Sequence, residues 1–213
     1  LMHAGVITGL PSRRTGVIVY RLLPAFPGIF EFTLMRGGTS EKDKKLARLF
    51  DTMFQEMSDL VQGNYDAIVP AMKHLPPTDR VIPVESQIDA GQENVLPADE
   101  VKKIIDKFDT IAVATCYCRH EKDLLGEPCQ VTNKRENCLV FGAGAQFTID
   151  QKFARPISKE EALKILQESE DAGLVHKSFH AKLDPAKEQE AICSCCKCCC
   201  GTFQLHYRGV RAM

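Results

Sequence analysis

The sequence predicts an α+β fold, in which an N-terminal hairpin and a long helix precede a smaller, cysteine-bearing α+β part. Three observations support this class. Two β-branched runs flank a polar turn near the start of the chain, a strong helical periodicity follows Ser40, and two later helical patterns each lead into a short apolar run. We divide the chain into residues 1–75, with the hairpin and the amphipathic helix, and residues 76–213, the cysteine-rich domain.

The hairpin is expected within the first thirty residues. The runs AGVITGL and GVIVYRLLP are rich in β-branched side chains, and the PSRRTG segment between them is polar and turn-forming. A short helix is expected in the following segment, PAFPGIFEFTLMR, where prolines act as punctuation before it.

The long helix is predicted to begin after Ser40, an N-cap residue with Glu41 and Asp43 in the first turn, and to end near Gly63. Its apolar residues recur at intervals of three and four positions: Leu46, Leu49, Phe50, Met53, Phe54, Met57, Leu60 and Val61. Such a face most commonly packs into the core of its own domain. It also offers a surface to a partner protein or to a second copy of the chain, so a homodimer or a larger complex is a further expectation.

The middle of the chain predicts three short elements. Three prolines restrict the segment HLPPTDRVIPVES to an edge strand or a connector. The segment PADEVKKIIDKFD predicts a short amphipathic helix, whose apolar face is formed by Val101, Ile104, Ile105 and Phe108. The run TIAVATC is typical of a buried strand and leads directly into Cys116.

The segment ISKEEALKILQESEDAGLVHKSF carries the clearest local signal. Ser158 and Glu161 have the spacing of a capping box, and Gly173 stands where a helix ends in the left-handed conformation. The run LVHKSF after this glycine predicts a short strand.

Composition argues against several classes of function. The net charge of the 213-residue chain is −1 and its pI is about 6.7, so no strong overall field attracts nucleic acid or a membrane surface. No apolar run approaches the ~18 residues of a membrane span. We find no P-loop and no nucleophile elbow, and the glycines of GAGAQF, residues 142–147, depart from the dinucleotide-binding fingerprint.

All ten cysteines fall in two blocks. The first block contains Cys116, Cys118, Cys129 and Cys138, and the second contains Cys193, Cys195, Cys196, Cys198, Cys199 and Cys200. Disulfide frameworks usually spread their cysteines along small secreted domains, and adjacent cysteines pair poorly with one another. We therefore expect thiols that bind metal in a reducing, cytoplasmic location.

The spacing of the cysteines does not choose between zinc and iron. Neither block has a zinc-finger pattern, and neither has the run of a bacterial ferredoxin. Four thiols in the first block equal the number that one [4Fe–4S] cluster requires, and basic residues flank the blocks. We expect three of these, Arg119, Lys134 and Arg135, to stabilise an anionic cofactor.

The prediction is that the first block ligates one [4Fe–4S] cluster and that the second block supplies ligands to another. In the second block we favour Cys193, Cys195 and Cys196 with either Cys199 or Cys200. The competing possibility is that the two blocks jointly hold a single cluster.

Several segments together resemble a family of [4Fe–4S] ferredoxin-type proteins of anaerobic microbes: VIPVE, TIAVATCYCRH, LLGEPC, ENCLVFG, ARPISKEEALKILQESEDAGLVH and AICSCCKCCC. The resemblance covers nearly the whole chain and implies cluster binding more than any particular reaction. It also implies a winged-helix-like N-terminal segment, with the hairpin as its wing. Members typically have further helices before this segment and tandem cluster motifs after it. The chain opens on Leu1 and lacks both, so we expect either that these segments were never present or that the chain is a fragment.

These observations lead to an expected function and to two others. The expected function is that of an electron carrier, or a subunit of a cytoplasmic oxidoreductase complex, which carries one or two [4Fe–4S] clusters and docks on a redox partner protein. The alternative is a redox-sensing winged-helix regulator, with Arg13 and Arg14 at the tip of the wing. The chain has no wide basic face, so DNA is the less favoured partner. The third possibility is an enzyme that reacts at the second cysteine block.

Overall fold

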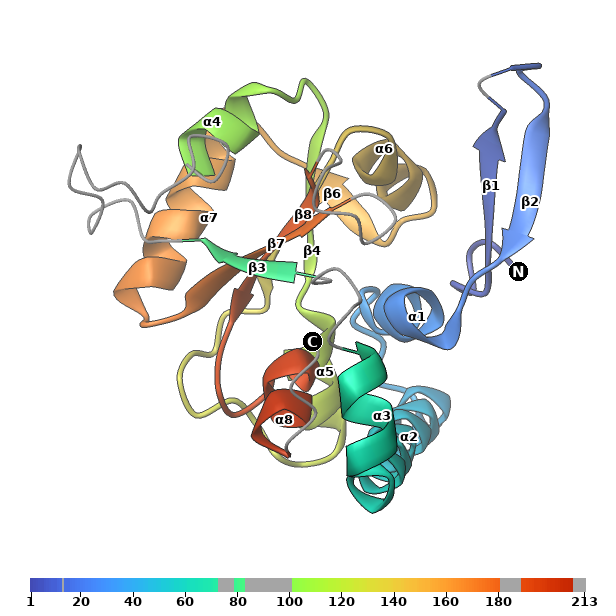
Figure 1. The fold of residues 1–213 in the computed structure, drawn as a ribbon. Helices are drawn as coiled ribbons and strands as arrows, with labels where there is room; N and C mark the ends of the chain where they lie inside the picture. The colour runs from blue at the N-terminus through green and yellow to red at the C-terminus, as the bar shows by residue number, and fades with distance from the viewer. Residues whose placement is uncertain (13, 73–78, 83–100, 181–188, 209–213) are drawn as a thin grey trace.

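The computed structural model describes residues 1–12, 14–72, 79–82, 101–180 and 189–208. It confirms the α+β class, because helices cover a six-stranded sheet, and a separate N-terminal hairpin stands apart from that sheet (Figure 1). The strands are β1 (Ile7–Pro11), β2 (Ile18–Leu22), β3 (Asp79–Ile82), β4 (Ile111–Thr115), β5 (Glu136–Phe141), β6 (Ala154–Pro156), β7 (Val175–His180) and β8 (Gln189–Cys195). The helices are η1 (Ala25–Ile29, a π-helical turn), α1 (Phe30–Leu34), α2 (Glu41–Gly63), α3 (Tyr65–Met72), α4 (Val101–Asp106), α5 (Tyr117–Leu124), α6 (Gly142–Asp150), α7 (Lys159–Asp171) and α8 (Gly201–Tyr207).

The main sheet has the strand order β3-β7-β8-β5-β4-β6, and each pair of neighbours is antiparallel. Chain order and sheet order differ, since β8, near the C-terminus, lies between β7 and β5. The β5–β8 pairing places Cys138 directly opposite Cys193. The topology therefore joins the two cysteine blocks at the centre of the sheet.

The two faces of the sheet have different coverings because successive side chains of a strand point in opposite directions. One face packs against α4 and α7 through a core that includes Val113 of β4, Leu139 of β5 and Ile192 of β8. The other face packs against α6, α1 and α5. Cys138 and Cys193 belong to this second face, beside the residues that join the sheet to the N-terminal helices.

The N-terminal helices pack on this second face through an aromatic core. Phe30 of α1 is fully buried, and its ring meets the rings of Phe50, Phe54 and Tyr117 edge-on at centroid distances of 4.9, 5.0 and 5.4 Å. Two residues of the apolar face predicted for the long helix, Phe50 and Phe54, are thus used inside the molecule, whereas Met57 is 37% exposed. Residues 1–75 and 76–213 therefore share one hydrophobic cluster.

Most local predictions from the sequence are confirmed. β1 and β2 form the expected hairpin, which projects from the body of the molecule (Figure 1). Ser40 caps α2 in a full capping box with Asp43, and Gly173 follows α7 with a φ of 77°. Ser158 caps α7 by accepting a hydrogen bond from the Glu161 amide, which confirms half of the predicted capping box. The Glu161 carboxylate pairs with Arg155 at 2.8 Å in place of the Ser158 amide.

Other segments differ from the prediction or lie outside it. The predicted edge strand is found as β3, at the edge of the sheet, and the rest of that segment, residues 74–78 and 83–86, lies outside the described residues. The predicted amphipathic helix is found as α4, and its first residues, 97–100, also lie outside the described residues. The segment GAGAQF belongs to helix α6, and β5 and β8 were not predicted. A hairpin and a helix do not define a winged helix, so that detail stays a prediction. In the described ranges, no helix combines the length and the hydropathy that a membrane crossing requires.

Candidate metal centre

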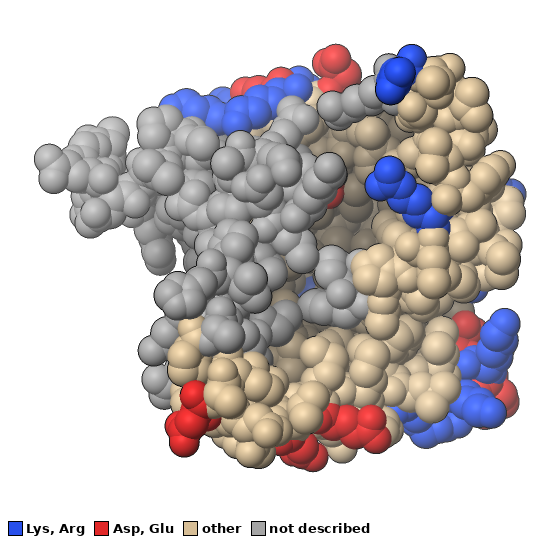
Figure 2. Space-filling view, turned by 45° about the vertical axis from the view of Figure 1, so that its right-hand side comes forward, with Lys and Arg blue, Asp and Glu red and all other residues tan. Residues whose placement is uncertain are grey.

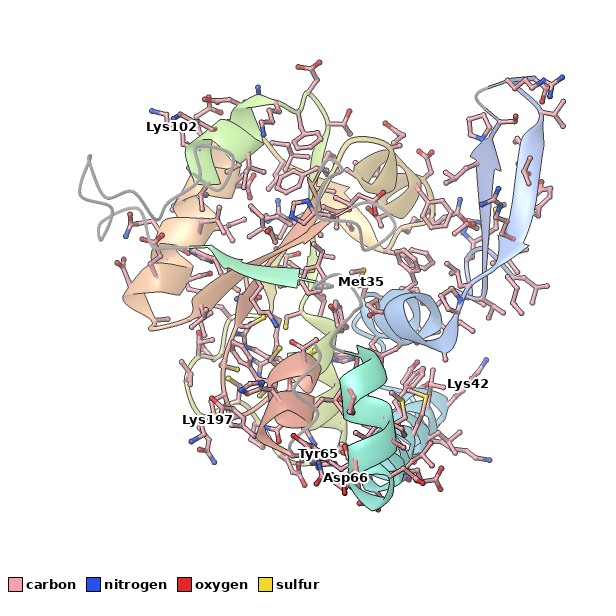
Figure 3. All side chains as sticks on the ribbon, in the orientation of Figure 1. Met35, Lys42, Tyr65, Asp66, Lys102 and Lys197 are labelled. Atoms are coloured by element: carbon pink, nitrogen blue, oxygen red, sulfur yellow. The ribbon has the colours of Figure 1, made fainter. Side chains whose placement is uncertain are left out.

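All ten cysteines lie among the described residues, and none is in a disulfide. Figure 3 shows their sulfur atoms gathered beside α5 and α8, at one end of the central strands. Their thiols form two groups. The six-thiol group consists of Cys116, Cys118, Cys138, Cys193, Cys195 and Cys200, and the four-thiol group consists of Cys129, Cys196, Cys198 and Cys199.

The strands and two helix starts position the six-thiol group. The sulfurs of Cys138 and Cys193 are 3.7 Å apart because β5 and β8 pair at these residues, and Cys195 follows two positions along the same face of β8. Cys116 directly follows β4 and is the N-cap residue of α5, and Cys200 is the N-cap residue of α8.

The six thiols line one small cavity of about 20 Å³, and Cys196 and Cys199 of the four-thiol group also reach its wall, so the two groups adjoin. This volume is about that of one water molecule. Binding of a cubic cluster therefore requires the cysteine side chains to rotate outward. In this group the surroundings of Cys200 favour its thiolate form. Hydrogen bonds from Cys118 and Cys195 hold its pKa well below the ordinary value, although burial opposes them.

The four-thiol group joins a loop to a tight turn. Cys129 lies in the loop between α5 and β5, and the other three follow β8 in a turn that is closed by a 3.1 Å hydrogen bond from the Cys200 amide to the Cys196 carbonyl. The Cys129 sulfur is 3.7 Å from the sulfurs of Cys196 and Cys198. Cys198 is also 3.6 Å from Cys196 and from Cys199.

Electrostatics favour a thiolate in the four-thiol group as well. The Cys199 thiol lowers the pKa of Cys196 to about 5 by donating a hydrogen bond; burial opposes this, and the charge of Arg119 adds to it. Burial opposes ionisation of Cys129 too, but the backbone amides of Thr132 and Val131 bring its pKa below the ordinary value. Each group thus contains at least one thiol prepared to act as an anionic ligand.

Arg119 lies between the two groups and is only 1% exposed. Its guanidinium donates hydrogen bonds to the Asn137 side-chain oxygen at 2.9 Å and to the Ser194 carbonyl at 2.8 Å. Burial alone would lower its pKa, but Cys116 and Cys196 raise it. Among the ion pairs of the described residues, none gives Arg119 a carboxylate partner.

The other two predicted basic residues bind carboxylates. Lys134 is half-exposed and pairs with Glu168. Arg135 binds Asp123 through two hydrogen bonds of 2.5 and 2.8 Å, and its carbonyl accepts a 2.6 Å hydrogen bond from the Cys116 amide. The structure thus brings Arg119 to the thiols as a buried cation, does not bring Lys134 there, and uses Arg135 to support the backbone at Cys116.

The division of the thiols differs from the prediction by sequence blocks. Cys129 was expected beside Cys116, Cys118 and Cys138, and the structure instead places it against the second block. The reason is tertiary. Strand pairing carries Cys193 and Cys195 to the first block, while the loop after α5 carries Cys129 across to the turn that follows β8.

Sequence reasoning missed several supporting residues. Asn137 and Ser194 hold Arg119, although nothing in the sequence marks them as its partners. Lys177 is the register partner of Cys193 and is buried; its ammonium donates a 2.6 Å hydrogen bond to Thr202, which lines the six-thiol cavity. For Lys177, the one signal in the sequence was the presence of a basic residue inside the predicted strand LVHKSF.

A second cavity of about 430 Å³ adjoins the six-thiol group. Both cavities are lined by Tyr117, Cys138 and Cys193, and the larger one also contains Glu31. Burial raises the pKa of Glu31 to about 7, although the Gly28 amide opposes the rise. Figure 2 shows a face with a hollow near its centre, with basic and acidic side chains distributed around its margin.

Comparisons of the chain with family models, curated proteins and solved structures found no match. The close group of cysteines could bind a metal.

Proposed function

We propose that the protein is an iron–sulfur electron-transfer protein, or a subunit of a cytoplasmic redox complex, whose [4Fe–4S] cluster is held by four of the six thiols in the six-thiol group. Bound there, the cluster would supply reversible one-electron chemistry. The donor set suits it, because thiolates are the usual ligands of such clusters and six buried or half-buried thiols surround one cavity.

The observation that carries the proposal is the buried Arg119. A guanidinium that is removed from water costs several kcal/mol unless an anion lies beside it. The described residues give it thiols and two neutral hydrogen-bond acceptors in place of a carboxylate. Thiolates bound to metal carry the negative charge that this cation requires, and Arg119 in turn favours the more negative, reduced form of a centre beside it.

The chain's own residues supply the environment of an electron carrier. Tyr117, Cys118, Cys138 and Cys195 are nearly inaccessible to solvent, which lowers the local dielectric and excludes water. Cys116 and Cys193 are only partly buried, so the group reaches toward the protein surface. We propose that a redox partner docks near these two residues.

Anaerobic purification, followed by analysis of iron and acid-labile sulfide, tests the proposal. We expect about four iron and about four sulfide per chain, with an EPR signal that appears on reduction and disappears on reoxidation. We propose that the register pair Cys138 and Cys193 are two of the four ligands, so Cys138→Ser and Cys193→Ser should each lose the iron, the sulfide and the signal. The matched control is Cys198→Ser, which lies in the four-thiol group and should keep all three.

Two results would refute the proposal. Wild-type protein that contains no acid-labile sulfide after anaerobic reconstitution would exclude the cluster. A signal that survives in both Cys138→Ser and Cys193→Ser would place the cluster elsewhere.

One observation favours a second candidate, an enzyme that reduces or oxidises a small molecule. The cavity of about 430 Å³ has the size of a small-molecule site and shares Cys138 and Cys193 with the six-thiol group. Glu31, with its pKa near 7, is suited to exchange a proton there. Turnover of a small molecule by the purified holoprotein, lost in Glu31→Gln, would favour this candidate over the carrier.

A further inference from the structure

We infer that the four-thiol group, Cys129, Cys196, Cys198 and Cys199, binds one tetrahedrally coordinated zinc ion, at a site that adjoins the proposed iron–sulfur cluster and uses other thiols. The inference concerns a different set of thiols from the proposed function and does not depend on it. It rests on the separations of the sulfur atoms, on the chain segments that supply them and on what surrounds them.

The sulfur separations match a single ion. A zinc–thiolate bond is about 2.3 Å long, so the edges of a regular tetrahedron of sulfurs around zinc measure about 3.8 Å. The Cys129 sulfur lies 3.7 Å from two of the others, and Cys198 lies 3.6 Å from Cys196 and Cys199. All four sulfurs lie within 4.8 Å of one another, and no second group in the described part of the chain meets that condition.

A cubic cluster requires a wider arrangement. Each cysteine of a [4Fe–4S] centre bonds a different iron, so the size of the cube is added to the separations between the sulfurs. All four sulfurs of the four-thiol group lie within 4.8 Å of one another, a compactness that the six-thiol group as a whole does not share, and four thiolates at tetrahedral corners are the usual ligands of structural zinc. The two groups of thiols therefore suit different metals.

The surroundings are those of a closed, structural site. The backbone amides of Thr132 and Val131 donate to the Cys129 sulfur, and the Gln130 amide donates to that of Cys198. Amide donors of this kind stabilise metal-bound thiolates. Leu174 and Ala172 pack against the group from the end of α7, and Arg119 contributes positive charge.

The four ligands complete the coordination of the ion and leave no position for a substrate. The ion would fasten the loop between α5 and β5 to the turn after β8. This turn is also held from α8, because the Gln204 side chain donates a 2.7 Å hydrogen bond to the Lys197 carbonyl. The site thereby fixes the segment that runs directly into Cys200 of the six-thiol group.

The test is the metal content of the full chain, purified without oxygen and measured by elemental analysis. We expect about one zinc per chain in addition to any iron. Cys198→Ser, which changes a half-buried residue, should lose nearly all of the zinc and keep the iron and sulfide. The matched variant is Cys195→Ser, three positions earlier and in the six-thiol group, which should keep the zinc whatever it does to the iron.

A second measurement covers the case in which Cys198→Ser fails to fold. Wild-type protein reconstituted with Co²⁺ in place of zinc should show the visible absorption and the sulfur-to-cobalt charge-transfer band of a tetrahedral tetrathiolate site. Absence of these bands would overturn the inference. It would also be overturned if Cys198→Ser lost iron and sulfide while its zinc content stayed at that of the wild type. Because the readouts are zinc and cobalt, this failure is distinct from failure of the proposed cluster, which is read from sulfide and EPR.

Discussion

Replacement of Arg119 by methionine should weaken metal binding far more than it destabilises the metal-free chain. The side chain is 1% exposed and makes two hydrogen bonds, to Asn137 and to Ser194. Their loss costs roughly 1.5–3 kcal/mol each, because the donor is charged. In the metal-free chain this cost is largely offset, since a buried cation without a carboxylate partner itself costs several kcal/mol.

The metal-loaded protein has no such compensation. There Arg119 faces metal-bound thiolates, and removal of one partner of a buried ion pair costs about 3–5 kcal/mol. Taking the lower end, the difference between the two states is about 3 kcal/mol, or roughly 100-fold in metal affinity. Competition with a chelator under anaerobic conditions measures this affinity. Arg119→Lys keeps the charge but loses the forked geometry of the guanidinium. Its metal affinity should lie between that of the wild type and that of Arg119→Met.

The reasoning is refuted if Arg119→Met binds metal within about threefold of the wild type, a difference of under 1 kcal/mol. It is also refuted if urea unfolding shows equal destabilisation of the metal-free and metal-loaded proteins, because the effect would then be one of packing alone.

Two further predictions concern the part of the molecule that supports the site. Phe30→Ala should lower the free energy of unfolding by about 3–5 kcal/mol, since Phe30 is fully buried against three aromatic rings; a loss under about 1 kcal/mol in denaturant unfolding would show that this core is not as packed as described. The raised pKa of Glu31 makes the folded state hold its proton after the unfolded chain has released it, so stability should fall as the pH rises from about 4.5 to about 7, by about 3 kcal/mol in all, and stay level above that. Glu31→Gln should remove this dependence, whereas the exposed Glu160→Gln should retain it; an unchanged pH profile in Glu31→Gln would assign the effect to another group.

The sequence by itself determined the local structure of this protein. Ser40 begins α2 because its side chain satisfies amides that the helix leaves unpaired, and Gly173 ends α7 because the chain there adopts a positive φ. The buried strand before Cys116 and the α+β class could also be predicted, as both follow from patterns of adjacent residues. β5 and β8 were missed because their cysteines were interpreted only as metal ligands, and because each strand is defined by pairing with residues far away in the chain.

Only the tertiary structure decided which thiols share a site. Ten cysteines in two blocks are compatible with many groupings, and spacing along the chain says nothing of which sulfurs meet across it. The antiparallel register sets Cys138 opposite Cys193, and the loop after α5 carries Cys129 to Cys196. These two contacts define the six-thiol group and the four-thiol group. The same folding removed Arg119 from water while Lys134 stayed at the surface, a distinction that depends on packing and that neighbouring residues in the sequence do not reveal.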